Sequence, residues 1–136
     1  MAGNQLQVFV VRRLNWQYGD DFYYRDEAGD APMKTFLDRG KAEAHRRQLE
    51  WDHVRSADVN PFGWVDAALE ERSTLPSSQL MRRLRQAGLR LEEDEDTTLS
   101  LWDQYKSLSE SQQRLVWEAI DRIRFFELVE MTVEIE

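Results

Sequence analysis

The sequence predicts an α+β fold in which an N-terminal antiparallel β-meander is joined by a C-terminal strand, with about five helices packed on one face. Three closely spaced segments near the start have high β propensity, and several later segments place apolar residues at helical spacing. The C-terminus alternates strictly between apolar and polar residues. With 136 residues, 41% of them hydrophobic, we expect residues 1–136 to form one domain.

Three N-terminal segments predict the strands of the meander. Leu6–Leu14 is apolar and rich in valine, which indicates a strand covered on both faces, and Asn15–Tyr18 continues it. Phe22–Arg25 and Met33–Leu37 follow turn segments rich in Asp and Gly. Their short spacing predicts that these three strands pair in sequence order.

Five segments predict helices, each opened by a capping signal. We expect them from Asp38 to about Val54, from Asn60 to Arg72, from Pro76 to Gly88, from Thr97 or Thr98 to Leu108, and after Ser109. In the first, Ala42, Leu49 and Trp51 are expected inward, and the solvent face is expected to carry Arg39, Lys41, Glu43, Arg46, Arg47 and Glu50. The last opens with a predicted capping box, Ser109 to Gln112, and its expected core residues are Leu115, Val116, Ala119, Ile120 and Ile123.

The C-terminal segment is the clearest predicted strand. Val129, Met131, Val133 and Ile135 alternate with Glu130, Thr132, Glu134 and Glu136, which predicts one buried and one acidic face. We expect this strand to close the N-terminal sheet and to form its edge. Edge strands often carry charge against stray pairing, although such an edge could also pair with a copy of itself.

Composition and charge exclude several classes of function. The net charge is −8, and residues 92–136 hold thirteen acidic against four basic side chains, which is unlike a general binder of polyanions. The absence of cysteine excludes disulfides, thiolate metal sites and cysteine nucleophiles. The chain shows neither a signal peptide nor an apolar run of membrane-spanning length, so we expect a cytoplasmic protein without a membrane partner.

No motif predicts a reaction, a cofactor or a metal. The glycines form no nucleotide-binding loop, and the G-x-S-x-G motif of serine hydrolases is missing. His45 and His53 would lie about 12 Å apart on one helix, too far to share a zinc ion. We therefore expect no cofactor, no metal site and no catalytic residues, and the sequence favours a protein that is not an enzyme.

The segment Pro76–Leu91 resembles the recognition helix of winged-helix DNA-binding proteins, through its small polar start, paired arginines and Ala-Gly-Leu ending. The resemblance covers one helix and implies nucleic-acid binding. A basic wing would follow in that family, whereas Glu92–Asp96 is acidic here and would repel phosphates. Nucleic-acid binding is thus the least favoured hypothesis, and the alternative is that these arginines pair with nearby carboxylates.

An aromatic hairpin is the main candidate binding surface. Alternate residues of a strand face opposite sides, so its aromatic side chains cannot all enter one core. Trp, Tyr and Arg are also enriched at binding hot spots. The candidate binding residues are Arg12, Trp16, Tyr18, Tyr23, Tyr24 and Arg25. The alternative is that the chain's own C-terminal helices cover the second face of this hairpin.

Three functions remain open, in descending order. The leading hypothesis is a non-enzymatic protein-interaction module that binds a protein partner, or a copy of itself, through the aromatic hairpin face or an exposed strand edge. The second is a small-molecule-binding domain or enzyme. Its pocket would be lined by Trp16, Tyr24, Trp102 and Trp117, with Arg12 or Arg25 holding an anion. The third is nucleic-acid binding.

Overall fold

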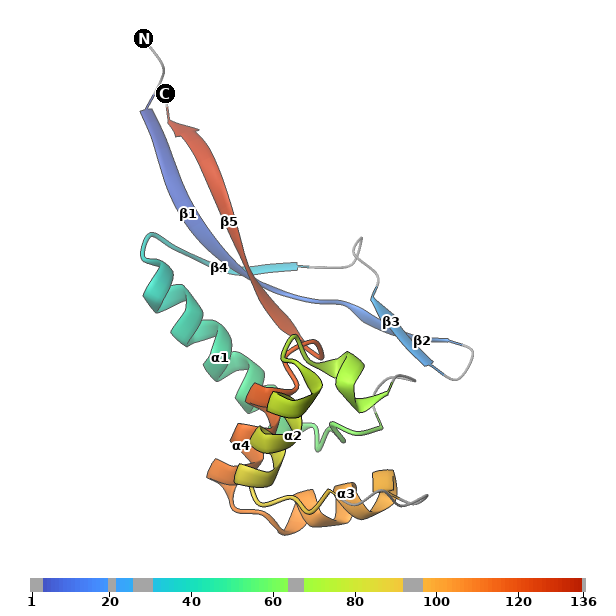
Figure 1. The fold of residues 1–136 in the computed structure, drawn as a ribbon. Helices are drawn as coiled ribbons and strands as arrows, with labels where there is room; N and C mark the ends of the chain where they lie inside the picture. Colours follow the sequence, from blue (N-terminus) through green and yellow to red (C-terminus); the bar gives the residue numbers. More distant parts are fainter. Residues whose placement is uncertain (1–3, 20–21, 26–30, 64–67, 92–96, 136) are drawn as a thin grey trace. The chain divides into compact units, whose positions relative to one another are not determined.

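The computed structural model describes residues 4–19, 22–25, 31–63, 68–91 and 97–135 (Figure 1). It is an α+β structure with a three-stranded antiparallel sheet and four α-helices among these residues. The chain divides into two compact units. Unit 1 comprises Met1–Gly19, Tyr24–Ala57 and Arg124–Glu136, and unit 2 comprises Asp20–Tyr23 and Asp58–Ile123. None of the described helices is both long and apolar enough to cross a membrane.

The sheet of unit 1 has the strand order β4-β1-β5. Its strands are β1 (Asn4–Arg13), β4 (Ala31–Phe36) and β5 (Phe126–Ile135). β5 pairs with β1 along its whole length, whereas β4 pairs only with Phe9–Arg13. The expectation that the C-terminal strand closes the N-terminal sheet at its edge is therefore confirmed.

The predicted meander is found in part: Trp16–Gly19 and Phe22–Arg25 pair with each other as expected, but the third predicted strand pairs with β1 and not with Phe22–Arg25. β2 (Trp16–Gly19) and β3 (Phe22–Arg25) form a separate two-stranded sheet. β4 instead pairs with Phe9–Arg13 of β1, on the side of β1 away from β5, so the third strand of the expected meander joins the first one directly.

Helix α1 (Arg39–Ser56) covers one face of the three-stranded sheet of unit 1. Asp38 caps it, since its carboxylate accepts a hydrogen bond from the Gly40 N–H at 3.2 Å. The core beneath the helix consists of Phe9, Val11 and Ala42, surrounded by Phe36, Leu49 and Leu128. Successive side chains of a strand point to opposite faces, so only every second residue of β1 and β5 faces α1.

The expected solvent face of α1 is wrong at two positions. Arg46 is only 6% exposed, and its Nη2 donates to Glu43 at 2.8 Å. Glu50 is half-buried. Arg46 follows the buried Ala42 by four residues and precedes Leu49 by three, so helical spacing places it on the covered side despite its charge.

Unit 2 is helical where it is described. It contains the 3₁₀-helix η2 (Leu69–Arg72) and the helices α2 (Ser77–Gln86), α3 (Thr97–Ser107) and α4 (Glu110–Ala119). Its buried side chains include Leu80, Leu84, Leu101, Tyr105, Val116, Trp117 and Ile120. The predicted capping box is confirmed, because the Ser109 hydroxyl accepts from the Gln112 N–H and the Gln112 side chain accepts from the Ser109 N–H.

Two helical expectations in unit 2 are wrong. The described part of residues 60–72 is a turn followed by η2, so the described residues contain four α-helices and not the five expected. Asn60 accepts from the Phe62 N–H at 2.9 Å and so stabilises a turn, and the buried Arg72 donates to the Phe62 carbonyl. On α4, Leu115 is 47% exposed, and the neighbouring Trp117 is buried instead.

Candidate functional site

The far part of the β1–β5 pair extends beyond the first turn of α1 (Figure 1). We call this part, Asn4–Val8 with Met131–Ile135, the distal ribbon. Its register runs from Asn4 opposite Ile135 to Val8 opposite Met131. β4 pairs with β1 only from Phe9 onward, so the distal ribbon has two strands among the described residues.

One face of the distal ribbon carries an exposed apolar row. Met131, Val133 and Ile135 are 49%, 42% and 45% exposed. Leu6 lies opposite Val133, which extends the row onto β1. The prediction that this face of the C-terminal strand is buried is therefore wrong. The alternation itself is as predicted, but α1 covers the opposite face, where Phe9 and Leu128 lie.

The outer edge of β5 is open where the structure describes the sheet. β5 pairs only with β1, and β1 lies on one side of it. A row of unpaired backbone N–H and C=O groups is a template for another strand. A two-stranded ribbon is also marginally stable in water, and a third strand adds stability. The edge and the apolar row are therefore a candidate binding surface.

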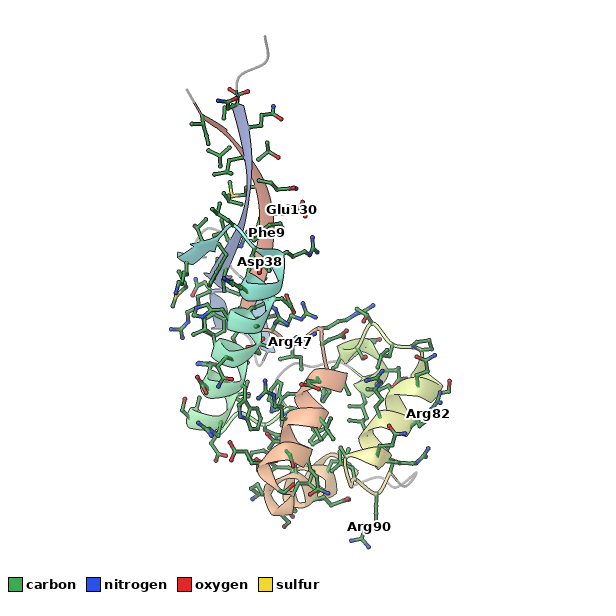
Figure 2. All side chains as sticks on the ribbon, turned by 90° about the vertical axis from the view of Figure 1, so that its left-hand side faces the viewer. Phe9, Asp38, Arg47, Arg82, Arg90 and Glu130 are labelled. Atoms are coloured by element: carbon green, nitrogen blue, oxygen red, sulfur yellow. The ribbon has the colours of Figure 1, made fainter. Side chains whose placement is uncertain are left out.

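The opposite face of β5 carries two carboxylates, Glu130 at the border of the distal ribbon and Glu134 within it. Glu130, labelled beside Phe9 in Figure 2, accepts from the Gln7 side chain, and Arg39 of α1 donates to it at 2.9 Å. Glu134 lies opposite Gln5 and has no ion pair among the described side chains. The distal ribbon contains no Lys or Arg. Its polar face is thus partly neutralised near α1 and negative toward the end of β5.

The start of β5 is held to α1 by a buried carboxylate. Both oxygens of Glu50 lie 2.9 Å from the Phe125 backbone N, which donates to them. Burial raises the pKa of Glu50 to about 7, and the favourable Phe125 N–H and the Arg46 charge only partly oppose this effect. The ring of His53 lies 4.5 Å from that of Phe125, and burial together with the charge of Arg13 lowers the pKa of His53.

Two of the predicted binding residues are found at this anchored end. Arg12 forms an ion pair with Glu127, its direct partner across the β1–β5 ladder. The indole N–H of Trp16 donates to the Arg124 carbonyl at 2.7 Å. The side chains of the other four lie outside the described part of the structure, so their role remains a prediction; they are Tyr18, Tyr23, Tyr24 and Arg25.

Two of the four aromatic residues proposed for a pocket, Trp102 and Trp117, share one cluster in unit 2. Trp102 stacks on Tyr105 with a centroid distance of 5.6 Å, and the indole N–H of Trp117 donates to the Tyr105 hydroxyl at 2.9 Å. This cluster belongs to unit 2, and Trp117 is buried in its core. Trp16 and Tyr24 belong to unit 1, and the Tyr24 side chain lies outside the described part.

A second charged surface lies on unit 2. Arg82, Arg83 and Arg85 of α2 and the nearby Arg90 are exposed, and Arg82 and Arg90 point away from the helices in Figure 2. Within the described residues, none of the four forms an ion pair. Over the same residues, no group of three or more His, Cys, Asp or Glu side chains could hold a metal ion.

Sequence reasoning named the edge of the C-terminal strand as a binding surface, but it expected the apolar face of that strand to be buried and Glu50 to lie on the solvent face of α1. Glu50 carries a weak signal, because it is three residues before His53 and four after Arg46 on the covered side of α1. The sequence does not indicate that the apolar row is exposed, because apolar residues alternate with a period of two whether or not another element covers that face.

Comparisons of the chain with protein-family models, with curated proteins and with solved structures found no match. A functional assignment therefore depends on the geometry and chemistry of the chain itself.

Proposed function

We propose that this protein is a non-enzymatic interaction module that binds another protein through the distal ribbon. The observation that carries the proposal is the row of three half-exposed aliphatic side chains, Met131, Val133 and Ile135, at an open strand edge. Soluble proteins usually protect such an edge or use it for recognition. The lack of cysteine agrees with a cytoplasmic setting for this activity.

The expected energetics favour strand addition over simple contact between apolar faces. The row itself offers only on the order of 200 Å² of apolar surface, whereas a stable interface buries about 800 Å² on each partner. An added strand supplements this area with main-chain hydrogen bonds along β5. Recognition through the backbone together with alternate side chains therefore suits this surface better than hydrophobic packing alone.

A matched pair of variants tests the proposal. Val133→Lys places a charge in the apolar row, and Leu115→Lys places the same charge at a similarly exposed position on α4 of unit 2. Tagged wild-type and variant proteins are used as bait in native lysate, and the bound proteins are quantified by mass spectrometry. We expect at least one partner to be reduced tenfold or more by Val133→Lys and retained by Leu115→Lys.

The same experiment can refute the proposal. Circular dichroism first establishes that both variants are folded. Partners that are captured equally by both folded variants would show that the distal ribbon is not the binding surface. Partners lost with both variants would point to an effect of net charge instead.

Binding of a polyanion is a second candidate function, supported by the exposed arginines of α2 and Arg90 without ion pairs among the described residues. The acidic run that follows in the sequence opposes it, because carboxylates repel phosphates. The test is salt-dependent retention on immobilised DNA or RNA. Retention at low salt that is lost on Arg82→Gln/Arg85→Gln would support this function, and passage without delay would exclude it.

A further inference from the structure

We infer that the partner of the distal ribbon is an extended protein segment with alternating apolar and basic side chains, added as a strand to the open edge of β5. This inference rests on the function proposed above and specifies its partner. Three features favour this partner: the length of the β5 edge, the two faces that β5 presents, and the poor fit of a second copy of the chain.

The edge of β5 is longer than the open edge of β1. β5 is a ten-residue strand whose outer side has no strand partner in the described sheet. The corresponding edge of β1 is open only from Asn4 to Val8, because β4 occupies the rest. A strand added to β5 can therefore make about twice as many main-chain hydrogen bonds as one added to β1.

The two faces of β5 specify the side chains of the added strand. Alternate residues of the new strand would lie beside Met131, Val133 and Ile135, where apolar side chains bury the exposed row. The remaining residues would lie beside Glu130 and Glu134. Opposite charges in adjacent strands stabilise a sheet, so Lys or Arg fits there. Glu130 is already shared with Arg39, and Glu134 is thus the main contact for a basic side chain.

A second copy of the chain fits this edge poorly. In a symmetric antiparallel pair of β5 strands, opposed residues must lie on the same face, so only certain registers are allowed. The two allowed registers with the longest overlap are centred on Glu130 and on Met131. The first places Glu130 opposite its own copy and Phe126 opposite Glu134, and the second places Leu128 opposite Glu134. Each copy also carries a net charge of −8.

Synthetic peptides test the inference directly on the whole chain. The probe is a fluorescent nine-residue peptide, Thr-Val-Lys-Val-Lys-Val-Lys-Val-Thr, with binding measured by anisotropy below the concentration at which it self-associates. Two controls carry Glu in place of Lys, or the same residues in a scrambled, non-alternating order. We expect the alternating basic peptide to bind at least tenfold more tightly than either control.

Backbone methylation tests strand addition separately from charge. Successive N–H groups of an edge strand point to opposite sides, so methylation of either the odd or the even amides removes only one set. One methylated peptide should lose at least tenfold in affinity and the other should bind like the parent. Equal binding by both would overturn strand addition.

A charge-reversal variant tests whether the basic side chains of the peptide lie beside Glu134 of β5. Glu134→Lys should weaken the basic peptide about fivefold and strengthen the acidic one. Glu118→Lys makes the same change at an exposed position of α4 in unit 2 and should alter neither affinity. Equal effects of the two variants would overturn the proposed role of the acidic face.

The two proposals fail in distinguishable ways. If no peptide binds, yet a lysate partner is lost only with Val133→Lys, the interaction function stands and the alternating basic partner is wrong. If sedimentation shows a dimer that Val133→Lys dissociates, the occupant is a second copy and the inference is overturned. If all alternating peptides bind equally, recognition by charge is refuted.

Discussion

The two ends of the β1–β5 pair share one ladder and one alternation but differ in what surrounds them. At the anchored end, α1 covers Phe9, Val11 and Leu128, and Glu50 accepts from the Phe125 N–H. In the distal ribbon, Met131 and the residues that alternate with it toward the C-terminus are half-exposed. The α1-facing apolar residues of the anchored end are thus buried, whereas the apolar residues of the distal ribbon lie on the opposite face and are exposed, where we propose the binding surface.

This difference shows that the burial of an apolar strand residue depends on whether another element packs on its face of the sheet. Val11 is fully buried, and Val133 is 42% exposed on a neighbouring strand. The chain stabilises the anchored end with a helix, a third strand and ion pairs. Among the described residues the far end has two strands, an arrangement that is marginally stable in water and that a third strand would stabilise. The predictions below test this contrast, from the largest expected effect to the smallest.

The largest effect is expected from the buried carboxylate. The pKa of Glu50 is raised from 4.5 to about 7, so the folded protein binds more protons than the unfolded chain between these values. The stabilising contribution is complete below pH 4.5 and is lost as the pH rises through about 7. It amounts to about 3 kcal/mol. Glu50→Gln should remove this decline and, since the amide oxygen still accepts from Phe125, should make the protein more stable than wild type at pH 8.

The measurement is the free energy of unfolding in urea between pH 4.5 and 8, taken as the difference between wild type and Glu50→Gln. The difference is needed because His53 acts in the opposite sense. Its pKa is lowered, so its contribution to stability increases as the pH rises through its ordinary value of 6.5. Parallel pH profiles for the two proteins would contradict a raised pKa at Glu50.

The second prediction compares the same substitution, Val→Ala, at the anchored end of the β1–β5 pair and in the distal ribbon. Val11→Ala leaves a cavity at a fully buried site and should lower the free energy of unfolding by about 2 kcal/mol. Val133→Ala should change it by less than about 0.5 kcal/mol, because that side chain is exposed. Chemical denaturation measures both. An equal loss of unfolding free energy in both variants would show that Val133 contributes as much to stability as the buried Val11, which would contradict the contrast between the two ends.

The third prediction concerns Trp16. Its indole N–H donates to the Arg124 carbonyl, so Trp16→Phe should cost about 1 kcal/mol of stability through the lost hydrogen bond. Partner binding should be unchanged, because the distal ribbon remains intact. A folded Trp16→Phe variant that loses its partner would return the binding surface to the aromatic hairpin.

The smallest effect is expected from the exposed ion pair near the boundary between the two ends. Arg39→Gln removes the contact with Glu130 at 2.9 Å and should lower stability by less than about 0.5 kcal/mol. It should increase affinity for the basic peptide, because Glu130 loses its competing cation. Reduced affinity in a titration by anisotropy would contradict the proposed acidic face.

The sequence predicts the local elements well, but it predicts poorly how they pair and which of their faces are buried. The cap at Asp38, the capping box at Ser109 and the alternation of β5 depend on neighbouring residues, and all three are found. The pairing of β4 with β1 depends on which strands meet, and alternation does not encode this. Arg46 has the helical spacing of the covered face, but its charge favoured the solvent face.

The candidate surface was predictable only in part. The open edge of the C-terminal strand follows from its alternation and position, but the exposure of Met131 requires knowledge of the face on which α1 packs. For the aromatic hairpin, the side chains of Tyr23 and Tyr24 lie outside the described part, and their proposed role remains a prediction.

Amide hydrogen exchange along β5, resolved residue by residue by NMR, tests the central claim most directly. Alternate N–H groups of an edge strand bond to the neighbouring strand, and the others face outward. In the free protein we expect every second amide of Phe126–Ile135 to exchange quickly, and these amides to become protected when the alternating basic peptide is added. Protection of all β5 amides in the free protein, or unchanged exchange with bound peptide, would contradict the open edge as the binding surface.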